Sequence, residues 1–91
     1  MIKIIRFITG EDVVADIEKK DGIVILKQPH RLVLTQEGLG SIPLCPFAKS
    51  SQYEVATQNI LFEADPEDQI RDSYADQIGA IVVPSKNILT P

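Results

Sequence analysis

The first 35 residues contain three apolar runs separated by two short polar turns. The runs cover residues 2–8, 13–19 and 23–35, and the turns fall at residues 9–12 (Thr-Gly-Glu-Asp) and 20–22 (Lys-Asp-Gly). Glycine adopts a positive φ without steric penalty, and Asp or Thr side chains bond to nearby backbone groups, so both turns favour chain reversal. The pattern therefore predicts an antiparallel meander of three β-strands.

The three runs differ in how their apolar residues are arranged. In the second run Val13, Ala15 and Ile17 form one face and Asp16 and Glu18 lie on the other, which is typical of a half-buried strand. The first run is apolar on both faces. Pro29 interrupts the third run, and because proline cannot donate a hydrogen bond to a neighbouring strand, it predicts a bulge, a bend or a sheet edge there. A long bent strand is typical of a small barrel.

The second half of the chain predicts shorter strands and then one helix. Residues 42–47 alternate around two prolines and favour a short edge strand or an extended segment. Residues 53–56 and 60–64 are strand-like, and the polar triplet Thr57-Gln58-Asn59 separates them. A helix is expected at about residues 66–78, because Asp65 can cap it and Pro66 suits its first position.

The expected helix has one narrow apolar stripe. Ile70, Tyr74 and Ile78 recur every four residues, which places them on a single face. Gly79 is a natural helix stop. Residues 80–83 then form a short strand or an anchor, and residues 85–91 form a tail.

Composition and charge limit the partners. The chain has 91 residues, of which 44% are hydrophobic, a generous share for one small core, so a partner subunit is one way to cover the surplus. The formal net charge is −4, and residues 51–91 carry seven acids against two bases. This balance argues against a general polyanion-binding surface, although a local basic rim in the first half is compatible with it.

Catalytic, metal and membrane functions find no support in the sequence. Cys45 is the one cysteine and His30 the one histidine, which provides no nucleophile–base pair, so we expect no enzyme and no cofactor. Acids in and before the expected helix fit capping and the helix dipole better than a calcium loop. The lone cysteine and the absence of a long apolar stretch favour a cytoplasmic protein without a membrane partner.

Two segments resemble Sm proteins. Residues 55–64 (Val-Ala-Thr-Gln-Asn-Ile-Leu-Phe-Glu-Ala) are similar to the second Sm motif, in which a polar turn joins two strands. In the first motif, residues 15–17 stand where Gly-x-Leu is usual, Asp21 matches the family's aspartate, and residues 31–34 (Arg-Leu-Val-Leu) resemble Asn-Leu-Val-Leu. Ala56 and Thr57 replace the Arg-Gly pair whose arginine helps Sm proteins hold a uridine base. The Sm resemblance covers roughly residues 2–64.

The beginning and the end of the chain resemble a second group. Residues 7–15 (Phe-Ile-Thr-Gly-Glu-Asp-Val-Val-Ala) and 79–84 (Gly-Ala-Ile-Val-Val-Pro) look like a family of short uncharacterised proteins from marine cyanophages, described as Sm-like. This resemblance covers nearly the whole chain and implies the host cytoplasm as the location.

Together the resemblances imply a mainly β, Sm-like fold. We expect a strongly bent five-stranded antiparallel small barrel at about residues 2–64, with a C-terminal helix, in a single domain of residues 1–84. Edge strands that pair between subunits would give a homo-oligomeric ring. The implied function is non-catalytic binding of single-stranded nucleic acid, with RNA favoured over DNA, in phage RNA or DNA processing. The alternative is a structural or protein-interaction module that binds no nucleic acid.

The candidate nucleic-acid-binding residues follow from the expected pore-facing turns. A basic, amide-rich rim can hold phosphates and base edges, whereas Lys-Lys-Asp-Gly can equally be a solvated hairpin turn. His30 could stack on a base, but a lone histidine at a bend is more often structural. Tyr53 is a further stacking candidate, while Phe47 and Tyr74 are expected to pack in the core. The candidates are Lys19, Lys20, His30, Arg31, Gln58 and Asn59.

Overall fold

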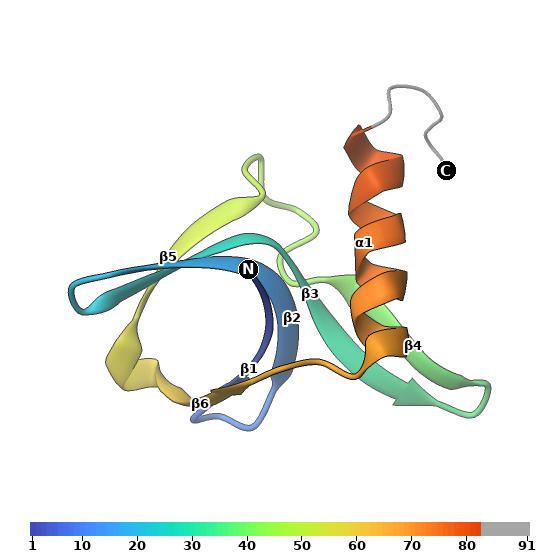
Figure 1. Ribbon diagram of the computed structural model, residues 1–91, viewed down its shortest axis with the longest axis horizontal. Helices are drawn as coiled ribbons and strands as arrows, with labels where there is room; N and C mark the ends of the chain where they lie inside the picture. Colours follow the sequence, from blue (N-terminus) through green and yellow to red (C-terminus); the bar gives the residue numbers. More distant parts are fainter. Residues whose placement is uncertain (83–91) are drawn as a thin grey trace.

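The computed structural model describes residues 1–82, with helix side chains described as far as Ile78 (Figure 1). A strongly bent antiparallel sheet makes up most of the chain, and one helix stands beside it. The elements are β1 (Ile2–Phe7), β2 (Asp12–Lys20), β3 (Ile23–Thr35), β4 (Gly38–Pro43), β5 (Gln52–Ala56), a 3₁₀ turn η1 (Thr57–Asn59), β6 (Ile60–Ala64) and α1 (Asp68–Val82).

The fold is mainly β and its sheet is antiparallel, as expected. The sheet has six strands and is not closed. Its order is β4–β3–β2–β1–β6, and β5 pairs with the first half of β3. Among the described residues β5 and β6 do not pair with each other; η1 alone joins them. The prediction of a strongly bent antiparallel sheet is therefore confirmed, whereas the prediction of a five-stranded barrel is wrong, because the sheet stays open. The sixth strand arises because the long strand β3 has different partners on the two sides of its bend, β5 at residues 23–27 and β4 at residues 30–35.

The bend in β3 lies at Pro29, as predicted. Gln28 has a φ of 49°, and the register between β2 and β3 shifts between Val14 and Asp16, the mark of a β-bulge. Loop residues bind the backbone at the bend: Gln28 N donates to Ser51 O at 2.6 Å, and Leu44 N donates to Pro29 O at 2.9 Å. The bend thus turns the sheet so that it wraps around its own inner face (Figure 1).

The inner face of the sheet holds the main core. Six buried aliphatic residues form it, and the five that are Ile, Val or Leu each contribute about 1.5–3 kcal/mol by leaving water. Phe7, Leu44, Val55 and Ile60 pack around its border. The six are Ile5, Val13, Ala15, Ile17, Val24 and Leu26.

Helix α1 begins later and ends later than predicted. Arg71 N donates to Glu67 O at 2.9 Å, so the first turn starts beyond Pro66, and Asp65 binds Lys3 instead of capping the helix. The helix also continues through Gly79 to Val82, which rules out a strand at residues 80–82. A glycine costs a helix about 1 kcal/mol and favours a stop only when no longer-range contact offsets it. The predicted tail, residues 85–91, lies outside the described residues.

The stripe predicted on α1 faces the outer side of the sheet. Tyr74 is only 2% exposed, while Ile70 and Ile78 are half-buried, so Tyr74 is a packing residue as expected. Phe47 was expected to pack too, and this is wrong, because its side chain is 97% exposed. Apolar neighbours in sequence did not predict burial there, since residues 44–51 form a loop between β4 and β5.

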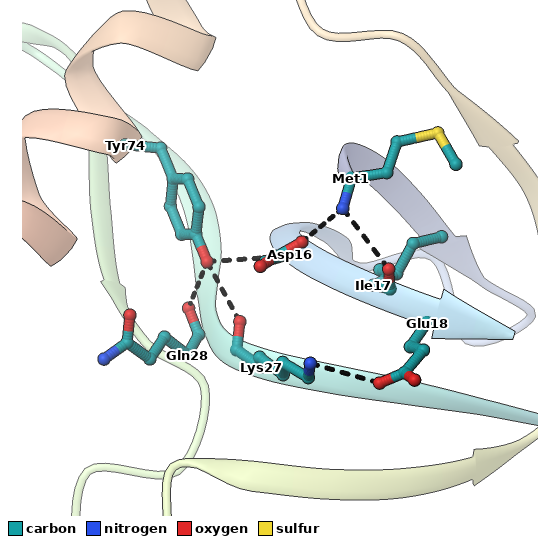
Figure 2. A network of polar contacts seen from close by, with 7 residues as sticks. All are labelled: Met1, Asp16, Ile17, Glu18, Lys27, Gln28 and Tyr74. Atoms are coloured by element: carbon teal, nitrogen blue, oxygen red, sulfur yellow. Dashed lines mark hydrogen bonds and ion pairs between the residues drawn. The ribbon is translucent and has the colours of Figure 1, made fainter.

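The hydroxyl of Tyr74 binds the backbone where the bulge breaks the β2–β3 ladder (Figure 2). Asp16 N donates to Tyr74 Oη at 3.0 Å, and the hydroxyl donates to Lys27 O (2.9 Å) or Gln28 O (3.0 Å). Burial raises the pKa of the Tyr74 phenol, so it stays protonated and able to donate. One side chain thereby satisfies the buried polar groups that the bulge leaves unpaired.

Candidate nucleic-acid interface

The turn between β2 and β3 lies beside η1, as the sequence predicted for the two loops. Gly22 occupies the turn with a φ of 73°, and its carbonyl accepts from Thr57 N at 3.1 Å. At the other end of η1, Ile8 N donates to Asn59 O at 3.0 Å. These backbone bonds hold η1 between two hairpin turns, as Figure 1 shows at the lower left. We call the group Lys19, Lys20, Gln58 and Asn59 the rim.

The two lysines of the rim differ in their surroundings. Lys20 is exposed and has no ion pair among the described residues. Lys19 lies two residues after the core residue Ile17 and shares its inner face, where Lys19 Nζ is 2.8 Å from Glu63 Oε1. Lys20 is therefore free to meet a phosphate, whereas Lys19 already has a carboxylate partner.

Gln58 and Asn59 present exposed amide side chains. Neither side chain makes a hydrogen bond to another described residue, so both keep free donors and acceptors. Amides can read base edges of single-stranded nucleic acid. The η1 backbone fixes where these two amides lie.

The structure does not bring Arg31 to the rim turn. Arg31 is opposite Val13 and Ile42, whereas Lys20 is opposite Ile23. Eight residues of β3, or about 26 Å of contour length, separate the two positions. Arg31 instead lies near the β1–β2 turn: the pKa of the Glu11 carboxyl is lowered mainly by a hydrogen bond from Thr9 and also by the Arg31 charge.

His30 lies beneath the helix, away from solvent. It is 7% exposed, its Nδ1 is 2.8 Å from Gln77 Oε1, and its ring meets that of Tyr74 edge-on with centroids 5.7 Å apart. Ser41 Oγ donates to the same Gln77 oxygen at 3.0 Å. This environment agrees with the structural role weighed for His30.

Most basic side chains are paired with acids. Lys3 binds Asp65, Arg6 binds Asp12, Lys19 binds Glu63, Lys27 binds Glu18, and Arg71 lies between Asp68 and Asp72. Within residues 1–78 only Lys20, Arg31 and Lys49 lack such a partner. The unpaired positive charge of residues 1–78 is therefore small and spread out.

Sequence reasoning missed Glu63 and Lys3, which lie with Lys19 and Asp65 on the inner face. The signal was present: Lys3 is two residues before the core residue Ile5, and Ile5 is opposite Glu63. Side chains two residues apart in a strand share a face, so Lys3 lies on the same face as Ile5, and Asp65 on the same face as Glu63. The hydrogen bond between them lowers the pKa of Asp65 and raises that of Lys3.

Two shallow cavities lie elsewhere and collect none of the rim residues. One, of about 240 Å³, lies between α1 and the β3–β4 hairpin and is lined by Leu32, Leu39 and Ile70 among others. The second, of about 250 Å³, is lined by Cys45, His30 and Tyr53 among others. Tyr53 uses its hydroxyl to bind Ser50 O, and Cys45 is exposed. The second cavity contains both Cys45 and His30, but no hydrogen bond joins these two side chains among the described residues, and His30 Nδ1 lies against Gln77 Oε1 instead.

The described part of the chain lacks two features, a cluster of metal ligands and a membrane-spanning helix. Within residues 1–82 no group of three His, Cys, Asp or Glu side chains is placed to hold a metal ion. Over the same residues no helix has the length and apolar character needed to span a membrane.

The free edges of the sheet are the remaining feature of interest. β6 pairs only with β1, and β5 only with β3, so each leaves one side without a partner in the described chain. Leu61 and Phe62 on β6 are 60% and 46% exposed. Arg6 lies over the Phe62 ring, 5.4 Å from its centroid.

In comparison with known proteins, the chain matches no protein-family model and no curated protein sequence.

Proposed function

We propose that this protein is an Sm-like, non-catalytic protein that forms a homo-oligomeric ring and binds single-stranded RNA at the rim. The observation that carries the proposal is the β5–η1–β6 unit. It connects two of the free edges of a strongly bent sheet, β5 and β6, through one 3₁₀ turn. Its first residue, Thr57, is bonded to the Lys20 turn at Gly22, and Gln58 and Asn59 follow directly. The resemblance of residues 55–64 to the second Sm motif concerns the same unit.

Ring formation is supported by the free edges of β5 and β6. An unpaired strand edge with exposed apolar side chains is a template for pairing with another chain. Because β5 and β6 are different surfaces, pairing them between subunits is head-to-tail, and it closes into a ring when the rotation fits. Such pairing would also cover Leu61 and Phe62.

RNA binding is supported by the free groups of the rim. One free lysine and two free amides per subunit bind weakly alone, but a ring presents the set several times to one strand. Each phosphate neutralised on a single strand adds about −0.7 to the slope of log affinity against log salt. We therefore expect salt-sensitive binding that depends on assembly.

The assembly is tested with an edge substitution. Leu61→Lys places a charge on the free edge and should reduce the mass measured by light scattering to that of the 10.1 kDa chain. The matched control is Leu34→Lys, since Leu34 is even more exposed but lies in β3 near the β3–β4 turn. A wild-type protein that is a monomer at all concentrations contradicts the ring.

Binding is tested by the fluorescence anisotropy of a labelled single-stranded RNA at low ionic strength. Lys20→Glu should weaken binding at least tenfold, because it reverses the free charge in every subunit. Lys49→Glu is the control with the same charge change on the β4–β5 loop, and it should have a smaller effect. DNA of the same sequence shows whether RNA is preferred. Equal effects of the two variants would contradict a site at the rim.

One observation favours a second candidate, a protein-interaction module that binds no nucleic acid. Ion pairs with acids occupy most of the described basic side chains, and the net charge is −4. A surface of this kind repels polyanions. An assembled wild-type protein without RNA or DNA binding at low ionic strength would support this candidate and exclude the first.

A further inference from the structure

Glu63 is the residue best placed to influence the rim. It lies on the inner face of β6, opposite Ile5, and reaches Lys19 across the open end of the sheet. The distance from Lys19 Nζ to Glu63 Oε1 is 2.8 Å. The Glu63 side chain is 29% exposed and that of Lys19 is 56% exposed, so the carboxylate is the more firmly held of the two.

Neighbouring charges leave Glu63 available to Lys19. Asp65, the next acid on the same face, is already bound to Lys3. Lys19 has no other acidic partner among the described residues. The pair therefore acts as a unit, and a phosphate that approaches Lys19 meets an ammonium group whose charge is already compensated.

We propose that Glu63 regulates RNA binding at the rim by competing with the RNA phosphate for Lys19. The inference rests on the proposed function. A phosphate must displace the Glu63 carboxylate before it binds Lys19, so one ion pair replaces another and the net gain is small. In the wild-type protein Lys20 then carries most of the phosphate affinity, and Lys19 contributes only when Glu63 is removed or neutralised.

The test compares Glu63→Gln with a variant of equal charge. Glu63→Gln keeps the side-chain shape and frees Lys19. The control, Asp72→Asn, also removes one negative charge, but on the exposed face of α1, away from the rim (Figure 1). A third variant, Lys19→Gln with Glu63→Gln, keeps the neutral residue at position 63 and removes the freed lysine.

The proposal predicts that Glu63→Gln binds single-stranded RNA at least about threefold more tightly than Asp72→Asn at low salt. The salt slope should steepen by about 0.7 for each phosphate gained. The double variant should lose this gain. Circular dichroism spectra should be the same for all variants, since exposed ion pairs contribute only about 0–1 kcal/mol to stability.

Each other outcome has a separate meaning. If the wild type binds RNA but Glu63→Gln and Asp72→Asn bind equally, competition is refuted while the proposed function stands. If the gain persists in the double variant, Glu63 acts by general repulsion and the proposal is again wrong. If neither the wild type nor Glu63→Gln binds RNA at low salt, the proposed function itself fails. Binding by Glu63→Gln alone would exclude RNA binding by the wild type, and with it the regulation proposed here.

Discussion

The substitution Tyr74→Phe removes one oxygen atom and tests what attaches the helix to the sheet. The aromatic ring stays, so no cavity forms, but the buried Asp16 N–H and the carbonyls of Lys27 and Gln28 lose their shared partner. A buried donor left without a partner costs about 1–3 kcal/mol. We expect a loss of about 2 kcal/mol, since the bulge offers no second acceptor among the described side chains.

Thermal unfolding followed by circular dichroism measures this loss, because the chain has no tryptophan. For a domain of this size about 2 kcal/mol lowers Tm by roughly 10 °C. Tyr53→Phe is the matched control: its hydroxyl also binds a carbonyl, that of Ser50, but in an exposed loop, so its Tm should change little. The two proteins must be compared at one concentration, since assembly shifts Tm. A Tm for Tyr74→Phe within about 2 °C of the wild type would refute the reasoning.

Three further predictions concern the turns and the surface. Gly22→Ala should destabilise the fold by roughly 1–2 kcal/mol, because Gly22 has a φ of 73°. A urea titration followed by circular dichroism measures this loss. Gly40→Ala is the control and should be nearly neutral, because its new Cβ would meet Val33 at an ordinary 3.6 Å. Asp12→Asn should remove stability that depends on pH. Hydrogen bonds from Arg6 lower the pKa of Asp12 in the folded protein below its ordinary value of 3.8. The extra stability of the wild type over Asp12→Asn is therefore full above pH 3.8, and it disappears as the pH falls through the pKa of the folded state. A Tm difference that grows in acid would contradict this sign. Phe47→Ser should leave the unfolding free energy within about 0.5 kcal/mol of the wild type, because the side chain is 97% exposed; a larger loss would show that Phe47 packs in solution.

Local patterns predicted most of the fold. Alternating residues such as Val13, Ala15 and Ile17 identified β2, and Pro29 located the bend, because both signals act within a few residues of the chain. The open sheet was not predictable in this way. Whether β5 meets β6 depends on how far the whole sheet curls, which no short segment determines. The helix start was also missed, because Asp65 has a partner, Lys3, that is distant in sequence.

The site was predicted less completely than the fold. The Sm resemblance implied that the Lys20 turn and the segment with Gln58 and Asn59 are neighbours, and the bond between Thr57 N and Gly22 O agrees with this. Sequence reasoning did not separate Arg31 from the rim, since the contour of β3 beyond the bend depends on pairing with β4. Glu63 was overlooked because charged residues on an inner face become visible only when strand register is known.

Native mass spectrometry of the protein mixed with single-stranded RNA at low ionic strength tests the central claim most directly. We expect a closed oligomer of the 10.1 kDa chain that carries RNA, and we expect Lys20→Glu to lose the RNA-bound species while it keeps the oligomer. A spectrum that contains only the monomer, or an oligomer that never carries RNA, would contradict it.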